Sequence, residues 1–189
     1  MYKRQRGELA EPCVALLKVN GYDGGFVFLL DTDAPYEVEL WQSGKNMIKG
    51  GQLQSELNSY QEIVGKANVD MGKLREEMNE ATSKKHFKTA GELKKKIENV
   101  KEKAQKELNA LVEKNKDNLF AAYIQTLGMG RMDLPILKQR YEQLSEKARQ
   151  TEPAKMMVAR IAALENVSVD AVAPDFTLQT PEGKEVAMY

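Results

Sequence analysis

The sequence has little of what cysteine and histidine chemistry needs. Its 189 residues include a single cysteine, Cys13, and a single histidine, His86. A disulfide within the chain needs two cysteines, so dithiol chemistry inside this chain is excluded. A structural zinc site takes about four Cys or His ligands, so such a metal cage is excluded as well. We therefore expect no cofactor and no metal, and the sequence yields no catalytic, cofactor-binding or metal-binding residue.

Net charge and long hydrophobic runs are absent too. Lysine plus arginine and aspartate plus glutamate number 28 each, so the formal net charge is zero. Global charge therefore does not indicate nucleic acid or an anionic membrane as a partner. No stretch approaches the roughly 18 apolar residues that span a bilayer. Lys3, Arg4 and Arg6 have no apolar run directly after them, so the N-terminus does not read as a secretory signal.

The first 48 residues predict a small β domain. Apolar runs at Cys13–Val19 and Phe26–Leu30 flank a segment rich in Gly, Asn and Asp, which is typical of a hairpin loop. Tyr36–Leu40 alternates apolar and acidic residues, as a strand with one solvated face does. We expect three strands in one antiparallel meander, followed by a loop at 41–51. A piece this small is marginal alone, so we expect preceding strands to be missing.

The chain from Gln52 to about Asn166 predicts helices. One helical face begins with Leu53, Leu57, Tyr60 and Val64 and is expected to extend to Ala67. The clearest apolar stripe is Leu93, Ile97, Val100, Ala104, Leu108 and Leu111. Its steps fit 3.6 residues better than a strict heptad, which favours packing within the chain over a coiled coil with another chain.

Shorter helices are expected after the stripe. Asp117 or Asn118 is expected to cap a helix that glycines end at 128–130, and Asp133 and Thr151 are expected to begin the next two. The residues expected to face inward are Ile136, Leu137, Tyr141, Leu144, either Met156 or Met157, Ile161 and Leu164.

Residues that could carry chemistry have ordinary structural interpretations as well. Between Lys84 and Glu107 there are nine lysines and four glutamates, and this mixture favours a solvated helix face over a phosphate or membrane site. Cys13, in an apolar run, is favoured as a small core residue. His86 has no acidic neighbour, which favours a solvated histidine. Tyr36 and Trp41 are favoured as aromatics closing the edge of a sheet rather than as a ligand platform.

The last residues contain the most specific motif. Val172–Leu178 and Pro181–Val186 form two short apolar runs around a Pro/Gly turn, which predicts a hairpin. The order Ala-Pro-Asp-Phe-x-Leu, then Glu-Gly-Lys-x-Val, resembles the opening of thioredoxin-like domains of the AhpC/TSA and TlpA/ResA group. The resemblance covers about 18 residues. It implies that residues 167–189 begin a thioredoxin-like domain that the sequence leaves incomplete.

The order of parts extends this resemblance. A β region at 1–48, a charged helical region at 49–166 and the Ala-Pro-Asp-Phe motif together resemble envelope thiol:disulfide interchange proteins of Bacteroidota. Those proteins carry an N-terminal β domain of the DUF4369 type. The resemblance implies an α+β chain truncated at both ends and a parent in the periplasm or cell envelope. Membrane attachment would come only through a leader or lipid anchor that is absent here.

The resemblance also sets the expected function. Family members exchange disulfides through Cys-x-x-Cys at a helix start, where the first thiol has a lowered pKa. No residue here matches either cysteine, and Cys13 does not correspond. We expect a fragment of an oxidoreductase whose partners are disulfide-bearing proteins, and no activity from this chain alone. Two alternatives remain open: a fragment of a peroxiredoxin, or a non-catalytic helical interaction module.

Overall fold

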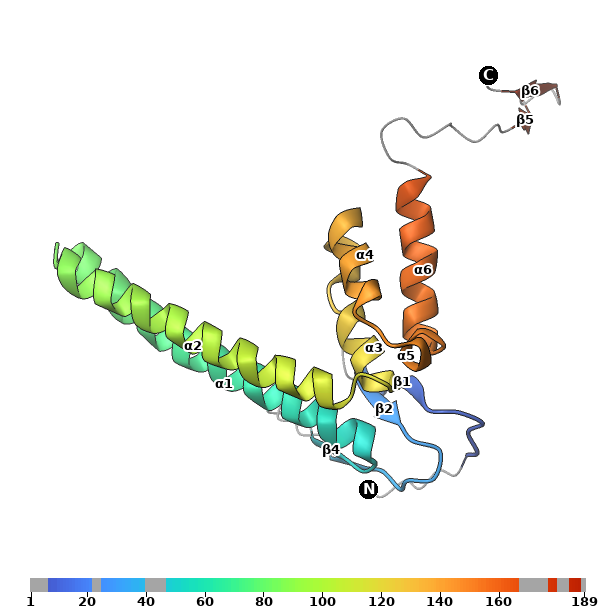
Figure 1. Ribbon diagram of the computed structural model, residues 1–189, viewed down its shortest axis with the longest axis horizontal. Coiled ribbons are helices and arrows are strands. Elements are labelled where there is room, and N and C mark those ends of the chain that lie inside the picture. Colours follow the sequence, from blue (N-terminus) through green and yellow to red (C-terminus); the bar gives the residue numbers. More distant parts are fainter. Residues whose placement is uncertain (1–6, 22–24, 40–46, 167–176, 180–183, 188–189) are drawn as a thin grey trace.

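The computed structural model describes residues 7–21, 25–39, 47–166, 177–179 and 184–187 (Figure 1). The α+β class predicted from the sequence is confirmed, because small antiparallel sheets accompany a mostly helical chain. The strands are β1 (Cys13–Leu17), β2 (Phe26–Leu30), β3 (Glu37–Glu39), β4 (Met47–Lys49), β5 (Thr177–Gln179) and β6 (Glu185–Ala187). The helices are α1 (Gln52–Ser83), α2 (Phe87–Lys114), α3 (Leu119–Thr126), α4 (Leu134–Glu142), α5 (Glu146–Arg149) and α6 (Glu152–Glu165), with a 3-10 turn η1 (Met129–Arg131).

The expected three-stranded meander is corrected by the strand pairing. β1 pairs with β2, whereas β3 pairs with β4. β4 lies inside the segment 41–51 that was expected to be a loop. A side chain of α1 explains why β3 does not join β2: Gln54 Oε1 accepts a hydrogen bond from Leu29 N–H at 2.9 Å. That N–H would otherwise face a third strand. β4 escaped prediction because its three residues stand among glycines.

Helices α1 and α2 form a long antiparallel arm that projects from the rest of the molecule (Figure 1). α1 has 32 residues, so at about 1.5 Å per residue it is roughly 48 Å long. Its inner face includes the predicted Ala67, which is buried, and continues in steps of three and four. The further members are Met71, Leu74, Met78 and Ala81. The predicted stripe of α2 packs on this face, so the expectation of packing within the chain is confirmed.

The helix connection at the end of the arm is a tight reversal. His86 N–H donates to Ala81 O at 2.8 Å and Lys85 N–H donates to Thr82 O at 2.9 Å. These bonds satisfy carbonyl groups that the last turn of α1 would leave free. Lys85 takes the left-handed conformation, with φ of 59°, which usually suits glycine in this type of helix end. The sequence offers no glycine there, and the reversal forms nonetheless.

Two apolar clusters hold the body together, and α3 contributes to both. The first joins β2, the base of α1 and α3 through Leu29, Leu53, Leu57, Leu119, Phe120 and Ile124. The second joins helices α3, α4, α5 and α6 through Ala122, Leu137, Leu144, Ala148, Ala154 and Met157. α3 is only eight residues long, and the five of them that are buried supply residues to both clusters. The first cluster contains residues from both sides of the boundary expected at 48/49.

Most predictions for the short helices are confirmed. The Asn118 side chain accepts hydrogen bonds from Phe120 N–H and Ala121 N–H, as an N-cap residue does. Asp133 and Thr151 stand at the starts of α4 and α6, although neither side chain caps. Ile136 was expected to face inward, which is wrong: it is 46% exposed. It precedes buried Leu137 in the first turn of α4, and one turn cannot bury two consecutive positions on a single face.

The hairpin expected near the end of the chain is confirmed at its strands. β5 pairs antiparallel with β6, with Leu178 opposite Val186. The expected strand start at Ala173 and the turn at Thr180–Gly183 lie outside the described residues.

Candidate functional site

The residues singled out in the sequence are not brought together. Cys13 lies in β1, partly buried, opposite Leu30. His86 is exposed at the far end of the arm, between α1 and α2. The Tyr36 ring lies beside Phe28, with 6.1 Å between ring centroids, whereas Trp41 lies outside the described residues. Cys13 and His86 belong to different ends of the molecule and do not form a nucleophile and base pair.

A cluster of polar contacts lies at the junction between the β region and α1. Asp31, directly after β2, accepts a hydrogen bond from Leu53 N–H at 3.1 Å and another from the Tyr36 hydroxyl at 3.2 Å. Asp31 N–H in turn donates to the Tyr36 hydroxyl at 2.7 Å. Burial raises the pKa of the Tyr36 phenol above its usual value, and the bond from Asp31 N–H opposes that rise. A carboxylate from the β region thus caps the N-terminus of α1.

Gly51 makes this junction possible. It precedes α1 with φ of 58°, a conformation that residues with a Cβ adopt at a cost. A Cβ at this position would overlap the Asp31 carboxylate and the Tyr36 hydroxyl. The absence of a side chain at Gly51 therefore lets Asp31 reach the helix start.

A second polar connection runs through two amide side chains of α1. Gln54 is 1% exposed and accepts from Leu29 N–H of β2. Its Nε2 donates to Asn58 Oδ1 at 2.7 Å, and Asn58 Nδ2 donates to Ile48 O of β4 at 2.8 Å. The chain of bonds from Leu29 through Gln54 and Asn58 to Ile48 ties both sheets to one helix. Side-chain amides here replace the backbone ladder that the meander would have had.

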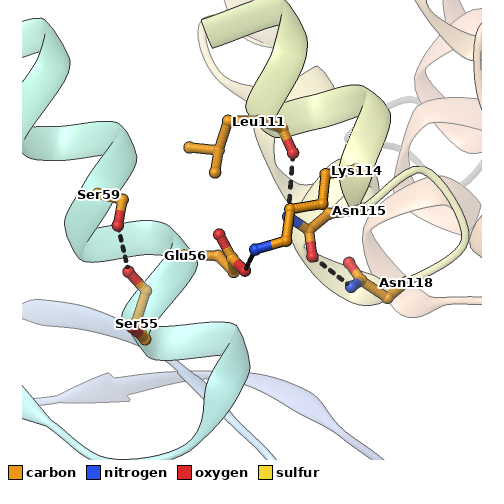
Figure 2. Close-up of polar contacts among 7 residues, drawn as sticks. All are labelled: Ser55, Glu56, Ser59, Leu111, Lys114, Asn115 and Asn118. Carbon is orange, nitrogen blue, oxygen red and sulfur yellow. Dashed lines mark hydrogen bonds and ion pairs between the residues drawn. The ribbon is translucent and has the colours of Figure 1, made fainter. Parts of the chain in front are cut away.

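A third polar connection joins the base of α1 to the end of α2, as Figure 2 shows. The largely buried Glu56 carboxylate accepts from Lys114 Nζ at 2.8 Å. Next to it, buried Asn115 donates to Leu111 O at 3.0 Å and accepts from Asn118 Nδ2 at 3.0 Å. Asn118 also caps α3. Hydrogen bonds made by neighbouring residues at the end of α2 and the start of α3 therefore orient α3 relative to the arm.

An open hollow of about 420 Å³ lies beside this junction. The starts of three helices line it: Gln52 of α1, Leu119 of α3 and Glu152 of α6. Helix N-termini attract anions, but acidic side chains of the chain itself already line the hollow. They are Glu11, Asp31, Asp117 and Glu152, with Lys147 as the one basic lining residue. The protein's own carboxylates therefore offset the attraction of these helix N-termini for an anion, and we assign the hollow no ligand.

Metal ligation and membrane crossing find no support in the described residues. Within them no group of three or more His, Cys, Asp or Glu side chains could hold a metal ion. In the same part of the chain, none of the helices is both long and apolar enough to cross a bilayer.

Comparison with known proteins gives no match: no protein-family model, no curated protein and no solved structure is significantly similar to this chain. The observations that bear on function are therefore the motif order and the geometry described above. That geometry holds a β region, an arm and a helical cluster in fixed relation through Asp31, Gln54 and Glu56. Sequence patterns missed Gln54 and Glu56 because polar residues next to an apolar stripe on a helix ordinarily read as solvated.

Proposed function

We propose that this chain is the accessory region and first hairpin of a thiol:disulfide oxidoreductase of the cell envelope, of the TlpA/ResA type. The single observation that carries the proposal is the Ala173-Pro174-Asp175-Phe176 motif with its Glu182-Gly183-Lys184 return. The pairing of β5 with β6 supports it, since a thioredoxin-like domain of this group opens with such a hairpin.

The order of elements supports the proposal as well. β hairpins come first, then helices, then the β5–β6 hairpin, as in the Bacteroidota proteins that the sequence resembles. The polar junction around Asp31 and Gln54 gives the β region a fixed place on α1. In this proposal the accessory region positions the redox domain relative to disulfide-bearing partner proteins in the envelope, and the redox domain carries the thiol chemistry.

The proposal predicts that the 189-residue chain reduces no disulfides. Thiol–disulfide exchange that releases a reduced substrate needs a second thiol to resolve the mixed disulfide, and Cys13 is the chain's one cysteine. Insulin reduction with dithiothreitol as electron donor measures this directly. The wild-type chain is expected to match its Cys13→Ser variant, and turnover above that control would contradict the assignment of Cys13 as a structural residue.

The decisive experiment is to read the coding sequence past Tyr189 and to purify its product. The proposal expects a Cys-x-x-Cys element at the start of the helix that follows the next strand. The longer protein should then reduce insulin, and Cys→Ser substitutions in that element should abolish the activity. A Pro-x-x-x-Thr/Ser-x-x-Cys element would instead identify a peroxiredoxin, and the absence of both elements would refute both redox assignments.

One observation favours a second function, a non-catalytic interaction module. The α1–α2 arm extends far beyond the two apolar clusters, and among the residues that the structure describes its outer half lies against no element outside the arm (Figure 1). Such an extension adds little to the stability of the folded core, whereas it suits an element that docks onto another protein. Capture of an envelope protein by the chain, lost when residues 70–103 are replaced by a short turn, would support this function. Retention of the same protein by the shortened chain would argue against it.

A further inference from the structure

The two outer edges of the β1–β2 hairpin differ. On β2, Leu29 N–H donates to Gln54 Oε1, and just beyond the strand Asp31 N–H donates to the Tyr36 hydroxyl. Side chains thus close that edge. In the part of the chain that the structure describes, no strand pairs with the outer edge of β1. An apolar edge strand left in this state is a template for another strand.

The register identifies which backbone groups of β1 face outward. Leu29 lies opposite Val14, and its N–H points out of the hairpin toward Gln54. Val14 and Leu29 are therefore a pair without mutual backbone hydrogen bonds, because in such pairs both residues direct N–H and C=O outward. The two kinds of pair alternate along the strand. Val14 and Leu16 consequently present the N–H and C=O groups of the outer edge.

The side chains at this edge are apolar and exposed. Leu16 is 55% exposed, Val14 37% and Val27 36%. Leu16 lies opposite Val27 and Val14 lies opposite Leu29, so the four share one face. Leu29 is fully buried under the helices. The covered face thus continues, without a change in chemistry, into an uncovered row of apolar side chains.

We propose that β1 pairs antiparallel with β1 of a second copy of this chain, about a two-fold axis at Ala15. Val14 then lies opposite Leu16 of the second copy, and each pair exchanges two backbone hydrogen bonds. The strand order becomes β2–β1–β1–β2, and each face gains continuous apolar rows. One row runs from Val27 and Leu16 of one copy to Val14 and Leu29 of the other.

Complementarity along the strand selects this register. A shift of two residues in one direction sets Leu16 opposite Pro12, which has no N–H to donate. A shift in the other direction sets Val14 opposite Lys18, which would place a charge directly against the apolar row. The Ala15 register pairs all five residues of β1 with each other. Parallel pairing in register would instead set Glu11 opposite Glu11 and Lys18 opposite Lys18, which brings like charges together.

Cysteine cross-linking tests the register in the full chain. In a Cys13→Ser background, Ala15→Cys sets two thiols in a pair without mutual hydrogen bonds, with Cα atoms about 4.5 Å apart. That separation suits a disulfide. Mild oxidation should give a covalent dimer with Ala15→Cys at least tenfold faster than with Leu16→Cys. Equal rates for the two variants would overturn the register, and so would a faster rate for Leu16→Cys.

Association itself is measured by size exclusion with light scattering over a wide concentration range. The wild-type chain should reach a discrete dimer. Leu16→Pro removes an outward N–H from each copy without touching the β1–β2 ladder, and should weaken the dimer about 30-fold, since each of two lost bonds contributes roughly 1 kcal/mol. Ile136→Ser, at an exposed apolar residue of α4, should leave the dimer unchanged and controls for general adhesion.

Circular dichroism melts establish that each variant folds. If Leu16→Pro does not fold, Leu16→Lys provides the same readout through a charge on the apolar row. A monomeric wild-type chain at all concentrations, a polydisperse aggregate, or a dimer that Leu16 variants leave intact would each overturn the proposal. The proposal concerns β1 alone and does not depend on the redox function.

Discussion

Gln54→Leu is the sharpest test of how the β region is attached to α1. Leucine has a similar size and no polar atom, so it leaves Leu29 N–H without the acceptor that Gln54 Oε1 supplies at 2.9 Å. It also removes the bond of 2.7 Å from Gln54 Nε2 to Asn58. Gln54 and Leu29 are both almost fully buried, so water does not replace the acceptor that Leu29 N–H loses.

The expected cost follows from these two bonds. A buried N–H without a partner costs about 1–3 kcal/mol, and the lost bond at partly exposed Asn58 adds about 1 kcal/mol. The additional apolar surface of leucine offsets roughly 1 kcal/mol. We expect Gln54→Leu to lower the free energy of unfolding by about 2 kcal/mol.

Urea unfolding at pH 7, followed by far-ultraviolet circular dichroism, measures this loss. Gln61→Leu is the matched control, because Gln61 lies two turns further along α1 and is exposed. Its effect should stay within about 0.5 kcal/mol, as is usual for surface substitutions. If Gln54→Leu and Gln61→Leu unfold at the same urea concentration, the amide connection does not hold the β region and the reasoning is refuted.

Gln54→Glu adds a pH-dependent form of the same test. The new carboxyl group can still accept from Leu29 N–H, but only its protonated form can donate to Asn58 Oδ1. Burial and this bond both favour the protonated form, so its pKa in the folded state is raised above the unfolded value of about 4.3. The contribution of this carboxyl group to the free energy of unfolding is therefore complete below pH 4.3 and is lost as pH rises through its folded-state pKa. Urea midpoints relative to wild type should improve from pH 7 to pH 4; a constant difference would contradict this bonding.

Two further predictions concern α1 and the tyrosines of the first cluster. Gly51→Ala should lower the free energy of unfolding by about 2 kcal/mol or more, from the left-handed conformation and the overlap with Asp31; Gly65→Ala, at an exposed helical position with open space, should raise it by about 0.5–1 kcal/mol. Equal effects of the two substitutions in urea unfolding would contradict the geometry of the junction. Burial raises the pKa of both Tyr60 and Tyr123 above the usual 10.0, so their contribution to stability is complete below pH 10 and declines as pH rises further. Thermal melts from pH 8 to 11 should show a steeper alkaline decline for wild type than for Tyr60→Phe; parallel declines would show that this phenol is not involved.

Helical periodicity predicted much of the fold because long amphipathic helices carry their burial pattern in the sequence. The stripe from Leu93 to Leu111, the Asn118 cap and the start of α6 were all readable in this way. Strand partners were not readable, since a hairpin pattern states which face is apolar and leaves open which neighbour pairs with an edge. The misplacement of β3 arose there, because an amide of α1 and not a strand takes the outer edge of β2.

The polar junction was beyond sequence reasoning for a different physical reason. Gln54, Glu56 and Asn58 stand beside Leu53 and Leu57, at positions that normally face solvent. Gln54 and Glu56 become buried, and Asn58 partly so, because strands and the end of α2 cover α1 on more than one side near its base. The apolar periodicity of a helix indicates only one buried face, so it cannot predict a contact on a second face. The motif at Ala173 was specific enough to suggest a family, whereas the contacts that orient its neighbours came only from the structure.

The seam between α1 and α2 has a consequence for how this molecule can change over time. Because the two helices run side by side through repeated, similar layers, removing seven residues from each at matched levels would bring the end of the arm about 10 Å closer to the body. Neither the reversal at Lys85 nor the junction at Asp31 would be altered. Paired insertions or deletions of seven residues in α1 and α2 can thus change the length of the arm without changing the structure at either of its ends.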